Sequence, residues 1–203
     1  DIREDTLNIN EKLIEAAITP NTKAIVAIHY AGVACEMDVI MDIAQRNNLM
    51  VVEDAAQGLG SYYKGKALGS IGDLGTLSFH ETKNVISGEG GALLVNDEQL
   101  ISRAEVIREK GTDRSQFRRS EVDKYTWQDI GSSFLPGEII AAFLLAQLEE
   151  AYNISDVRIK AYDHYHKALK SLEVQNKIRR PHVPNNCQHN GHMYFILLPS
   201  NIE

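Results

Sequence analysis

Hydrophobic and polar residues follow one another along the first half of the chain in the pattern of a parallel α/β sheet. Residues 23–29 (KAIVAIH) and 49–53 (LMVVE) are short apolar runs, typical of parallel strands that are covered on both faces. Between them, residues 36–47 carry apolar side chains at helical spacing, namely Met37, Ile40, Met41 and Ala44. A strand, a helix and a second strand in this order predict a right-handed parallel crossover and an α/β fold.

The rest of the chain extends this pattern with further helices and strands. The helix over residues 137–152 is apolar almost all round, so we expect it to be buried against the sheet or against a partner subunit. The apolar spacing predicts the other helices over residues 10–18, 97–110 and 154–172, and strands over residues 75–79, 91–95 and, after a turn-rich joint, 192–198.

The composition narrows the class of protein. The chain has 203 residues, enough for one domain with a good core or for one domain and part of another. Its 21 basic and 28 acidic residues give a formal net charge of −7, which argues against a nucleic-acid surface because phosphate contacts need clustered lysine and arginine. The densest basic stretch, residues 114–119, is short and is interpreted as a loop that could contact an anionic small molecule.

Cysteine content and the length of the apolar runs favour a reducing cytoplasm. Cys35 and Cys187 allow at most one disulfide, and their spacing supports neither a metal site nor a disulfide framework. The longest apolar run, residues 139–146, is far shorter than the ~20 residues that cross a bilayer, and no signal peptide is visible. The chain begins with Asp1 instead of Met and stops directly after a strand-like segment, so we expect it to be a fragment of a longer protein.

Polar residues gather where three of the predicted strands end. Residues 53–57 (EDAAQ) close one strand, residues 78–84 (SFHETKN) close another, and residues 29–32 (HYAG) close a third. Ligands of open α/β sheets bind outside the carboxyl ends of the strands. Each residue taken singly also has a structural interpretation, because an Asp after a strand is most often a turn former and a lone Lys is nearly always solvated. Residues 88–91 (GEGG) precede a strand instead of opening a helix, which argues against a Rossmann site.

Taken together, these segments resemble a known family. Residues 53–97 contain, in order, an ED-x-A-Q segment, an SF-x-x-x-K segment and an EGG segment. This pattern is similar to that of the nucleotide-sugar aminotransferases of the DegT/DnrJ/EryC/StrS type, which depend on pyridoxal 5'-phosphate (PLP), and the likeness covers essentially the whole chain. The resemblance implies an aspartate-aminotransferase-like fold (PLP fold type I). Residues 1–155 would be part of the PLP-binding large domain, with a mainly parallel sheet flanked by helices, and residues 156–203 would be a linking helix and the start of a small α/β C-terminal domain.

The resemblance also implies roles for four residues, two catalytic and all four in contact with the cofactor. Lys83 matches the lysine that forms a Schiff base with PLP and later moves a proton between the cofactor and the substrate carbon. Asp54 matches the carboxylate that keeps the pyridine nitrogen protonated, so that the ring can accept electrons. Gln57 matches a side chain near the phenolic oxygen of the ring, and Ser78 matches a hydroxyl donor to the phosphate. No metal ion is implied.

Other polar residues are left outside this catalytic set. His29 and His80 could line the pocket, but a hydrogen-bonded structural role is at least equally well supported for each, and Glu89 is interpreted as structural. Many family members carry an Asn-x-Arg segment where Ser133 and Leu135 stand, and its Asn reaches the PLP phosphate of the partner subunit. The Ser-Ser version is similar to one branch of the family, so we interpret it as a mark of that branch.

That branch makes dTDP-4-amino-4,6-dideoxygalactose for enterobacterial common antigen. The resemblance to it implies transamination of a dTDP-4-keto-6-deoxyhexose with L-glutamate as the amino donor, in a homodimer in the bacterial cytoplasm. Residues 114, 118 and 119, all arginines, are candidates for contacting the diphosphate, with a solvated loop as an equal alternative. The segments most similar to this branch are residues 29–38 (HYAGVACEMD), 109–117 (EKGTDRSQF) and 123–134 (DKYTWQDIGSSF).

Several alternatives stay open. The nearest is another nucleotide-sugar aminotransferase, acting at C3 or giving the other C4 epimer. A non-catalytic protein on the same fold is opposed by intact Lys83, Asp54 and Gln57, and a PLP-dependent sugar dehydratase is opposed by Lys83 itself, because that class has His at this position. Other parts of the family's cofactor site are expected upstream of Asp1, so we expect an isolated fragment to bind PLP weakly and to turn over little or no substrate.

Overall fold

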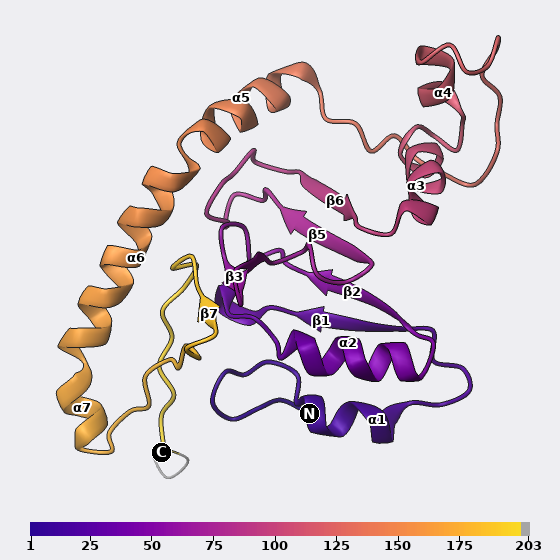
Figure 1. Ribbon diagram of the computed structural model, residues 1–203. Helices are drawn as coiled ribbons and strands as arrows, with labels where there is room; N and C mark the ends of the chain where they lie inside the picture. Colours follow the sequence, from indigo (N-terminus) through magenta and orange to yellow (C-terminus); the bar gives the residue numbers. More distant parts are fainter. Residues whose placement is uncertain (200–203) are drawn as a thin grey trace.

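The computed structural model describes residues 1–199, and a four-stranded sheet forms its centre (Figure 1). The last four residues of the second predicted domain lie outside the described part. The strands lie in the order β1-β2-β5-β6; the first three run parallel and β6 runs antiparallel to β5. The predicted α/β sheet of mainly parallel strands is confirmed. The strands are β1 (Ala24–Ile28), β2 (Met50–Asp54), β5 (Leu74–Ser78) and β6 (Gly91–Val95).

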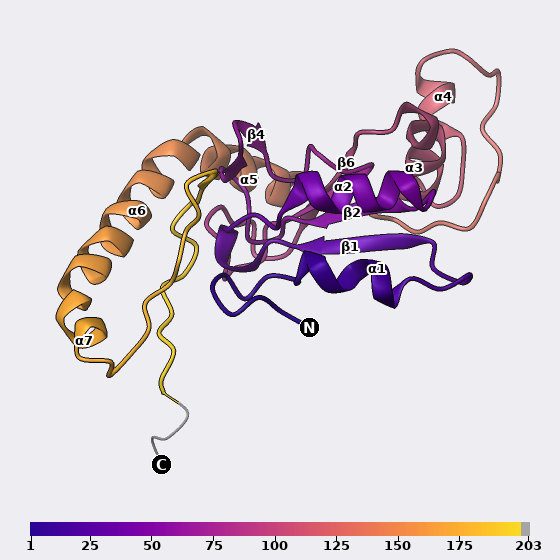
Figure 2. The same cartoon turned by 60° about the horizontal axis from the view of Figure 1, so that its bottom comes forward.

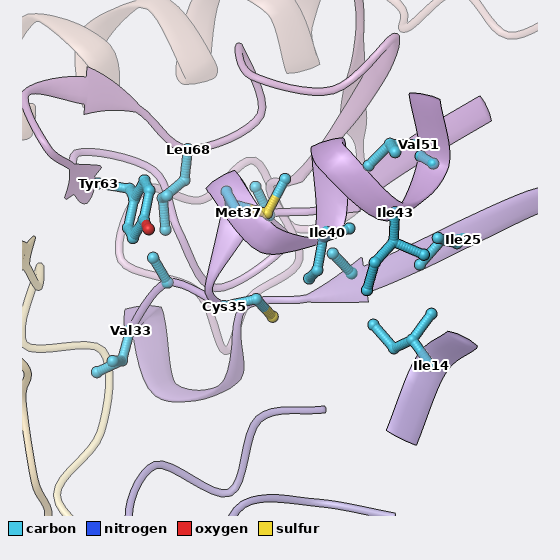
Figure 3. Packing of buried hydrophobic residues seen from close by; sticks show 14 of the residues in the cluster. Ile14, Ile25, Val33, Cys35, Met37, Ile40, Ile43, Val51, Tyr63 and Leu68 are labelled. Carbon is cyan, nitrogen blue, oxygen red and sulfur yellow. The ribbon is translucent and has the colours of Figure 1, made fainter. Parts of the chain in front are cut away.

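Two helices cover one face of this sheet. Helix α1 (Ile14–Ala17) follows a 3-10 turn, and helix α2 (Met37–Arg46) connects β1 to β2 as the alternating pattern predicts. The side chain of Asn10 caps the turn by accepting a hydrogen bond from the backbone N–H of Lys12 at 3.2 Å. Figure 3 shows the core between these helices and the strands. Its buried members include Ile14, Ile25, Met37, Ile40, Ile43 and Val51.

Alternate residues of the strands face two different environments. Ile25 and Ala27 of β1 point into the core, whereas Val26 and Ile28 point to the other face and are 52% and 54% exposed. The same alternation in β2 buries Glu53 completely and leaves Asp54 partly exposed. We call these the closed face and the open face of the sheet.

A second, smaller sheet brings the far end of the chain back to the first. It consists of β4 (Lys66–Ala67), β3 (Tyr62–Tyr63) and β7 (Cys187–Gln188), all paired antiparallel. Figures 1 and 2 both show the chain after the last helix running back between α6 and the main sheet. The intervening helices are α3 (Ile101–Arg108), α4 (Arg114–Arg118), α5 (Glu138–Glu149), α6 (Ala151–Ala168) and α7 (Lys170–Val174).

The structure corrects two predictions made from apolar patterns. The strand predicted over residues 192–198 is not formed. Leu197 makes one isolated bridge to Arg179, and no strand within residues 1–199 pairs with the rest of the segment. Of the two places predicted for α5, the sheet is not the one observed, because none of its residues is buried and Ile139 is 86% exposed. Burial of α5 against a partner subunit stays a prediction.

The basic stretch at residues 114–119 is not a loop. Most of it forms the short helix α4, and two of its arginines have carboxylate partners. Arg118 lies 3.5 Å from Glu109, and Arg119 lies 2.8 Å from Glu105. These pairs partly neutralise the charge that suggested a contact with a diphosphate.

Neither a disulfide nor a metal cluster is found in the described part of the chain. Cys35 and Cys187 are both buried free thiols, and burial raises the pKa of Cys35 to about 12. Residues 1–199 contain no group of three or more His, Cys, Asp or Glu side chains placed to hold a metal ion. Among the same residues, no helix combines the length and the apolar character needed to cross a bilayer.

Candidate active site

The candidate site lies where the carboxyl ends of β1, β2 and β5 meet. Asp54 is the last residue of β2, and its register partners are Ile28 of β1 and Thr76 of β5. Ser78 ends β5 two residues beyond Thr76, so its side chain lies on the same open face as Asp54. This edge is the position at which ligands bind in open α/β sheets.

The carboxylate of Asp54 is available to a cation. It accepts one hydrogen bond, from the backbone N–H of Ala56 at 3.1 Å. Within residues 1–199 no lysine, arginine or histidine forms an ion pair with it. A partly buried carboxylate without a positive partner is a favourable place for a cationic group of a ligand.

Gln57 is fixed by a strained turn. Its Oε1 atom accepts a hydrogen bond from the backbone N–H of Ala31 at 2.6 Å. Ala31 has a left-handed backbone conformation, with φ of 57° and ψ of 20°, which costs roughly 1–2 kcal/mol for a residue other than glycine. This bond places the carbonyl oxygen of the side chain toward the turn, so the NH2 group of Gln57 is left to donate to a ligand.

Gly32, the next residue of this turn, permits a close approach. A Cβ atom there would lie 2.9 Å from the carbonyl oxygen of Gln57 and 2.4 Å from Oδ1 of Asn190. Gly32 also has a positive φ of 77°. The turn after β1 therefore packs directly on the loop that carries Gln57.

Ser78 also keeps a donor for a ligand. Its Oγ atom accepts a hydrogen bond from the backbone N–H of His80 at 3.3 Å. Since a hydroxyl both donates and accepts, the proton of Ser78 stays available to an anionic group on the open face.

Lys83 lies in the loop between β5 and β6. Backbone hydrogen bonds close the base of this loop, from Phe79 N–H to Gly90 O at 2.9 Å and from Glu81 N–H to Gly88 O at 3.0 Å. The backbone N–H of Lys83 donates to the carbonyl oxygen of His80 at 2.9 Å. Its side chain is partly buried, and no carboxylate of residues 1–199 pairs with it. We call residues 79–90 the lysine loop.

Glu53 and His29 are structural, as one of the two interpretations of His29 predicts. The backbone N–H of Cys35 donates to Nδ1 of His29 at 3.1 Å, so the ring proton lies on Nε2 and is donated to Glu53 at 2.9 Å. The backbone N–H groups of residues 69, 71 and 72 donate three further hydrogen bonds to the carboxylate of Glu53. Burial opposes ionisation of Glu53, but His29 and these N–H groups outweigh it, so the pKa of Glu53 is lowered.

The other residues that were set aside have local partners. Nδ1 of His80 accepts a hydrogen bond from the backbone N–H of Thr82 at 3.2 Å. The side chain of Glu89 is 87% exposed and lies 3.7 Å from His80. Ser133 is exposed in the segment that precedes α5, where it forms an isolated bridge to Glu109. Its contact with a partner subunit stays a prediction.

Sequence reasoning missed three residues that join the site. The side chain of Asn190 donates to the carbonyl oxygens of residues 57 and 59, the side chain of Asn84 donates to Asn190, and His192 contacts Asn84. Burial, and then the positive charges of Lys83 and Arg158, lower the pKa of His192 to about 4. The signals in the sequence were the polar run at residues 185–192, directly before an apolar segment, and, for Asn84, its place at the end of the polar segment 78–84.

Comparison with known proteins finds relatives with the same fold. GDP-perosamine synthase of Caulobacter vibrioides is 36% identical over 193 residues, which are 95% of this chain and 50% of that protein. An aminotransferase from Psychrobacter cryohalolentis is 31% identical with a TM-score of 0.87, over 95% of this chain and 51% of that one. DesI, solved in the presence of its TDP-sugar product, is 27% identical with a TM-score of 0.85, over 98% of this chain and 48% of that one.

These solved aminotransferases confirm the predicted fold class. The chain spans about half the length of the curated relatives it matches, 50% in the case of the synthase. The family match itself extends over all of residues 1–203. The chain belongs to the DegT/DnrJ/EryC1/StrS aminotransferase family.

Proposed function

We propose that the protein containing this chain is a PLP-dependent aminotransferase that converts a dTDP-4-keto-6-deoxyhexose into dTDP-4-amino-4,6-dideoxygalactose, with L-glutamate as the amino donor. One observation carries the proposal. Asp54 and the lysine loop meet at one edge of the sheet, and neither the carboxylate of Asp54 nor the amine of Lys83 has a charged partner among residues 1–199. A ligand with a cationic ring nitrogen and an aldehyde would use both groups.

The donors at this edge fit PLP. The free NH2 group of Gln57 suits the phenolic oxygen of the ring, and the hydroxyl of Ser78 suits a phosphate oxygen. Asp54 suits the ring nitrogen, because a carboxylate stabilises its protonated form. The four predicted residues therefore offer one group of the right polarity to each polar end of the cofactor.

The proposed mechanism assigns one task to each side chain. PLP, when bound, supplies an aldehyde that binds amines and a ring that accepts electrons from the neighbouring carbon. Asp54 holds the proton on the ring nitrogen, and Gln57 and Ser78 fix the orientation of the ring. Lys83 would hold the aldehyde when no amino donor is bound, and its free amine would take the proton from the α-carbon of L-glutamate. In the second half-reaction the same amine would deliver a proton to C4 of the sugar.

Residue-specific labelling tests this assignment. The full-length protein with PLP should show a visible absorbance band, and borohydride should then fix a pyridoxyl group to the peptide that contains Lys83. Lys83→Ala should remove both the band and transamination. Lys66→Ala is the matched control, because Lys66 is an exposed lysine of the small sheet. Normal turnover by Lys83→Ala would contradict the proposal.

A second nucleotide sugar is a specific alternative. The similarity to GDP-perosamine synthase, at 36% identity, favours a GDP-linked keto sugar as the other candidate acceptor. Assays with dTDP-4-keto-6-deoxyglucose, its 3-keto isomer, and GDP- and UDP-linked keto sugars would separate these possibilities. NMR of the product would identify the C4 epimer, and light scattering would test the proposed homodimer.

A further inference from the structure

We propose that Asn84 and Asn190 are positioning residues that hold the lysine loop against the loop carrying Gln57. This inference rests on the proposed function, because it concerns the alignment of Lys83 with the cofactor. It adds two residues to the four that the family resemblance supplies, and it brings in a part of the chain that lies beyond the predicted domain boundary at residue 155.

Asn190 connects the end of the chain to the loop after β2. Its side chain is 1% exposed, and its Nδ2 atom donates to the carbonyl oxygen of Gln57 at 2.8 Å and to that of Leu59 at 2.9 Å. Its Oδ1 atom accepts the backbone N–H of His192 at 3.0 Å. Both donors and one acceptor position of this buried amide are therefore bonded to backbone atoms.

Asn84 connects the same segment to the lysine loop. It follows Lys83 directly, and its Nδ2 atom donates to the backbone carbonyl of Asn190 at 2.9 Å. Its Oδ1 atom lies 3.0 Å from Nδ1 of His192. Since an amide oxygen can only accept a hydrogen bond, Nδ1 of His192 is the donor. The two asparagines thus form one path of buried hydrogen bonds from Gln57 to the residue beside Lys83.

Helix α6 holds this path from the other side. The guanidinium of Arg158 donates to the carbonyl oxygen of His192 at 2.7 Å and to that of Gly191 at 3.3 Å. A Cβ atom on Gly191 would lie 2.8 Å from the backbone carbon of Arg158, so the segment passes directly against the helix. Residues 190–192 are consequently fixed between α6 and the edge of the sheet.

A fixed path of this kind matters for catalysis because Lys83 lies on a loop. Rotation or displacement of the loop by about 1 Å can lower a rate by roughly 100-fold. The bonds that close the base of the lysine loop fix residues 79–90 to each other. Among residues 1–199, only the hydrogen bonds of the Asn84 side chain tie the tip of this loop to the Gln57 side of the site.

Two measurements on the full-length protein test the proposal. Hydrogen exchange without PLP should become faster in the peptide covering residues 80–88 in Asn190→Ala and in Asn84→Ala. With PLP, kcat of both variants should be about 10- to 100-fold lower, whereas the KM for L-glutamate should change little. The pH midpoint of the visible absorbance band should shift in both variants. The double variant should resemble either single variant, because both bonds belong to one unit.

Asn96→Ala is the control. Asn96 also donates from one amide to two carbonyl oxygens, those of Gly69 and Gly72, but near the opposite ends of the strands. It should lower the melting temperature without changing kcat or the pH midpoint. If Asn190→Ala and Asn84→Ala behave as Asn96→Ala does, the positioning role is wrong. If the unaltered protein shows no band with PLP, the proposed function fails instead. In that case, faster hydrogen exchange in residues 80–88 of the two variants would still show that the asparagines hold the lysine loop.

Discussion

Glu53 and Asp54 are neighbours in β2, but their carboxylates lie on opposite faces of the sheet in opposite environments. On the closed face, Glu53 is fully buried and accepts four hydrogen bonds from His29 and three backbone N–H groups. On the open face, Asp54 accepts one, from Ala56. The fold supplies Glu53 with hydrogen-bond donors on both carboxylate oxygens and leaves Asp54 able to bind a ligand. Two adjacent acidic residues can therefore serve folding and chemistry separately, because the strand turns successive side chains to opposite faces.

The largest expected effect is on the open face. Asp54→Asn should lower turnover about 10²- to 10³-fold, because it removes a charge aimed at the ring nitrogen. The free energy of unfolding should change by less than about 0.5 kcal/mol, since the side chain has few partners within the fold. Steady-state kinetics and urea unfolding of the same preparation measure both quantities. Equal losses of activity and stability would contradict the separation of the two faces.

The neighbouring substitution should give the reverse result. Glu53→Gln replaces a buried carboxylate that binds His29 and the turn at residues 69–72, and we expect it to lower the free energy of unfolding by about 3 kcal/mol. The fraction that remains folded should bind PLP with nearly normal affinity. Urea unfolding and PLP titration at a temperature where the variant is folded check this. Loss of PLP binding in a stably folded variant would place Glu53 in the site.

Stability should fall in two separate pH windows. The folded protein lowers the pKa of His192 from 6.5 to about 4, so the unfolded chain binds this proton first, and stability is lost as the pH drops from 6.5 to 4. Because the pKa of Glu53 is lowered, its ionised form stabilises the fold at pH values above 4.5, the ordinary pKa of a glutamate. This stabilisation is lost as the pH falls through the pKa of Glu53 in the folded protein.

Unfolding by urea from pH 7 to pH 3 can separate these windows. His192→Asn should reduce the upper window, to which the lowered pKa values of His166 and His189 also contribute, and should leave the lower window. Glu53→Gln should reduce the lower window and leave the upper one. A single window common to both variants would show that the two groups titrate together.

The smallest effects should distinguish adjacent apolar residues of β1. Ile25→Val, on the closed face, should lower the free energy of unfolding by about 0.5–1.5 kcal/mol because it removes a methylene from the core. Val26→Ala, on the open face, should change it by less than about 0.5 kcal/mol. Urea unfolding of both variants measures the difference. A larger loss for Val26→Ala would mean that the open face is covered.

Local pattern was sufficient to predict the centre of the fold. Strands β1, β2, β5 and β6 lie within one residue of the predicted ranges, because each is a short apolar run bounded by polar residues. The positions of Asp54 and Ser78 follow from those strands, since each ends one. Lys83 and Gln57 follow closely after them in the sequence. The residues predicted for the site are therefore those whose positions are set by strands close to them in the sequence.

Long-range contacts were beyond such reasoning. The bond from Asn190 to Gln57 joins residues 133 positions apart, and an Asn in a polar run is ordinarily solvated. Residues 192–198 and helix α5 are apolar, but whether an apolar segment pairs or is buried depends on a partner element that its own sequence does not specify. These are the parts of the structure in which the predictions were incomplete or wrong.

The most direct test is a crystal structure of the full-length protein with PLP. We expect the carboxylate of Asp54 to lie about 3 Å from the pyridine nitrogen, on the open face of the sheet. Continuous electron density should join Nζ of Lys83 to the cofactor. A cofactor that contacts only one of these two residues, or that binds elsewhere in the protein, would contradict the account.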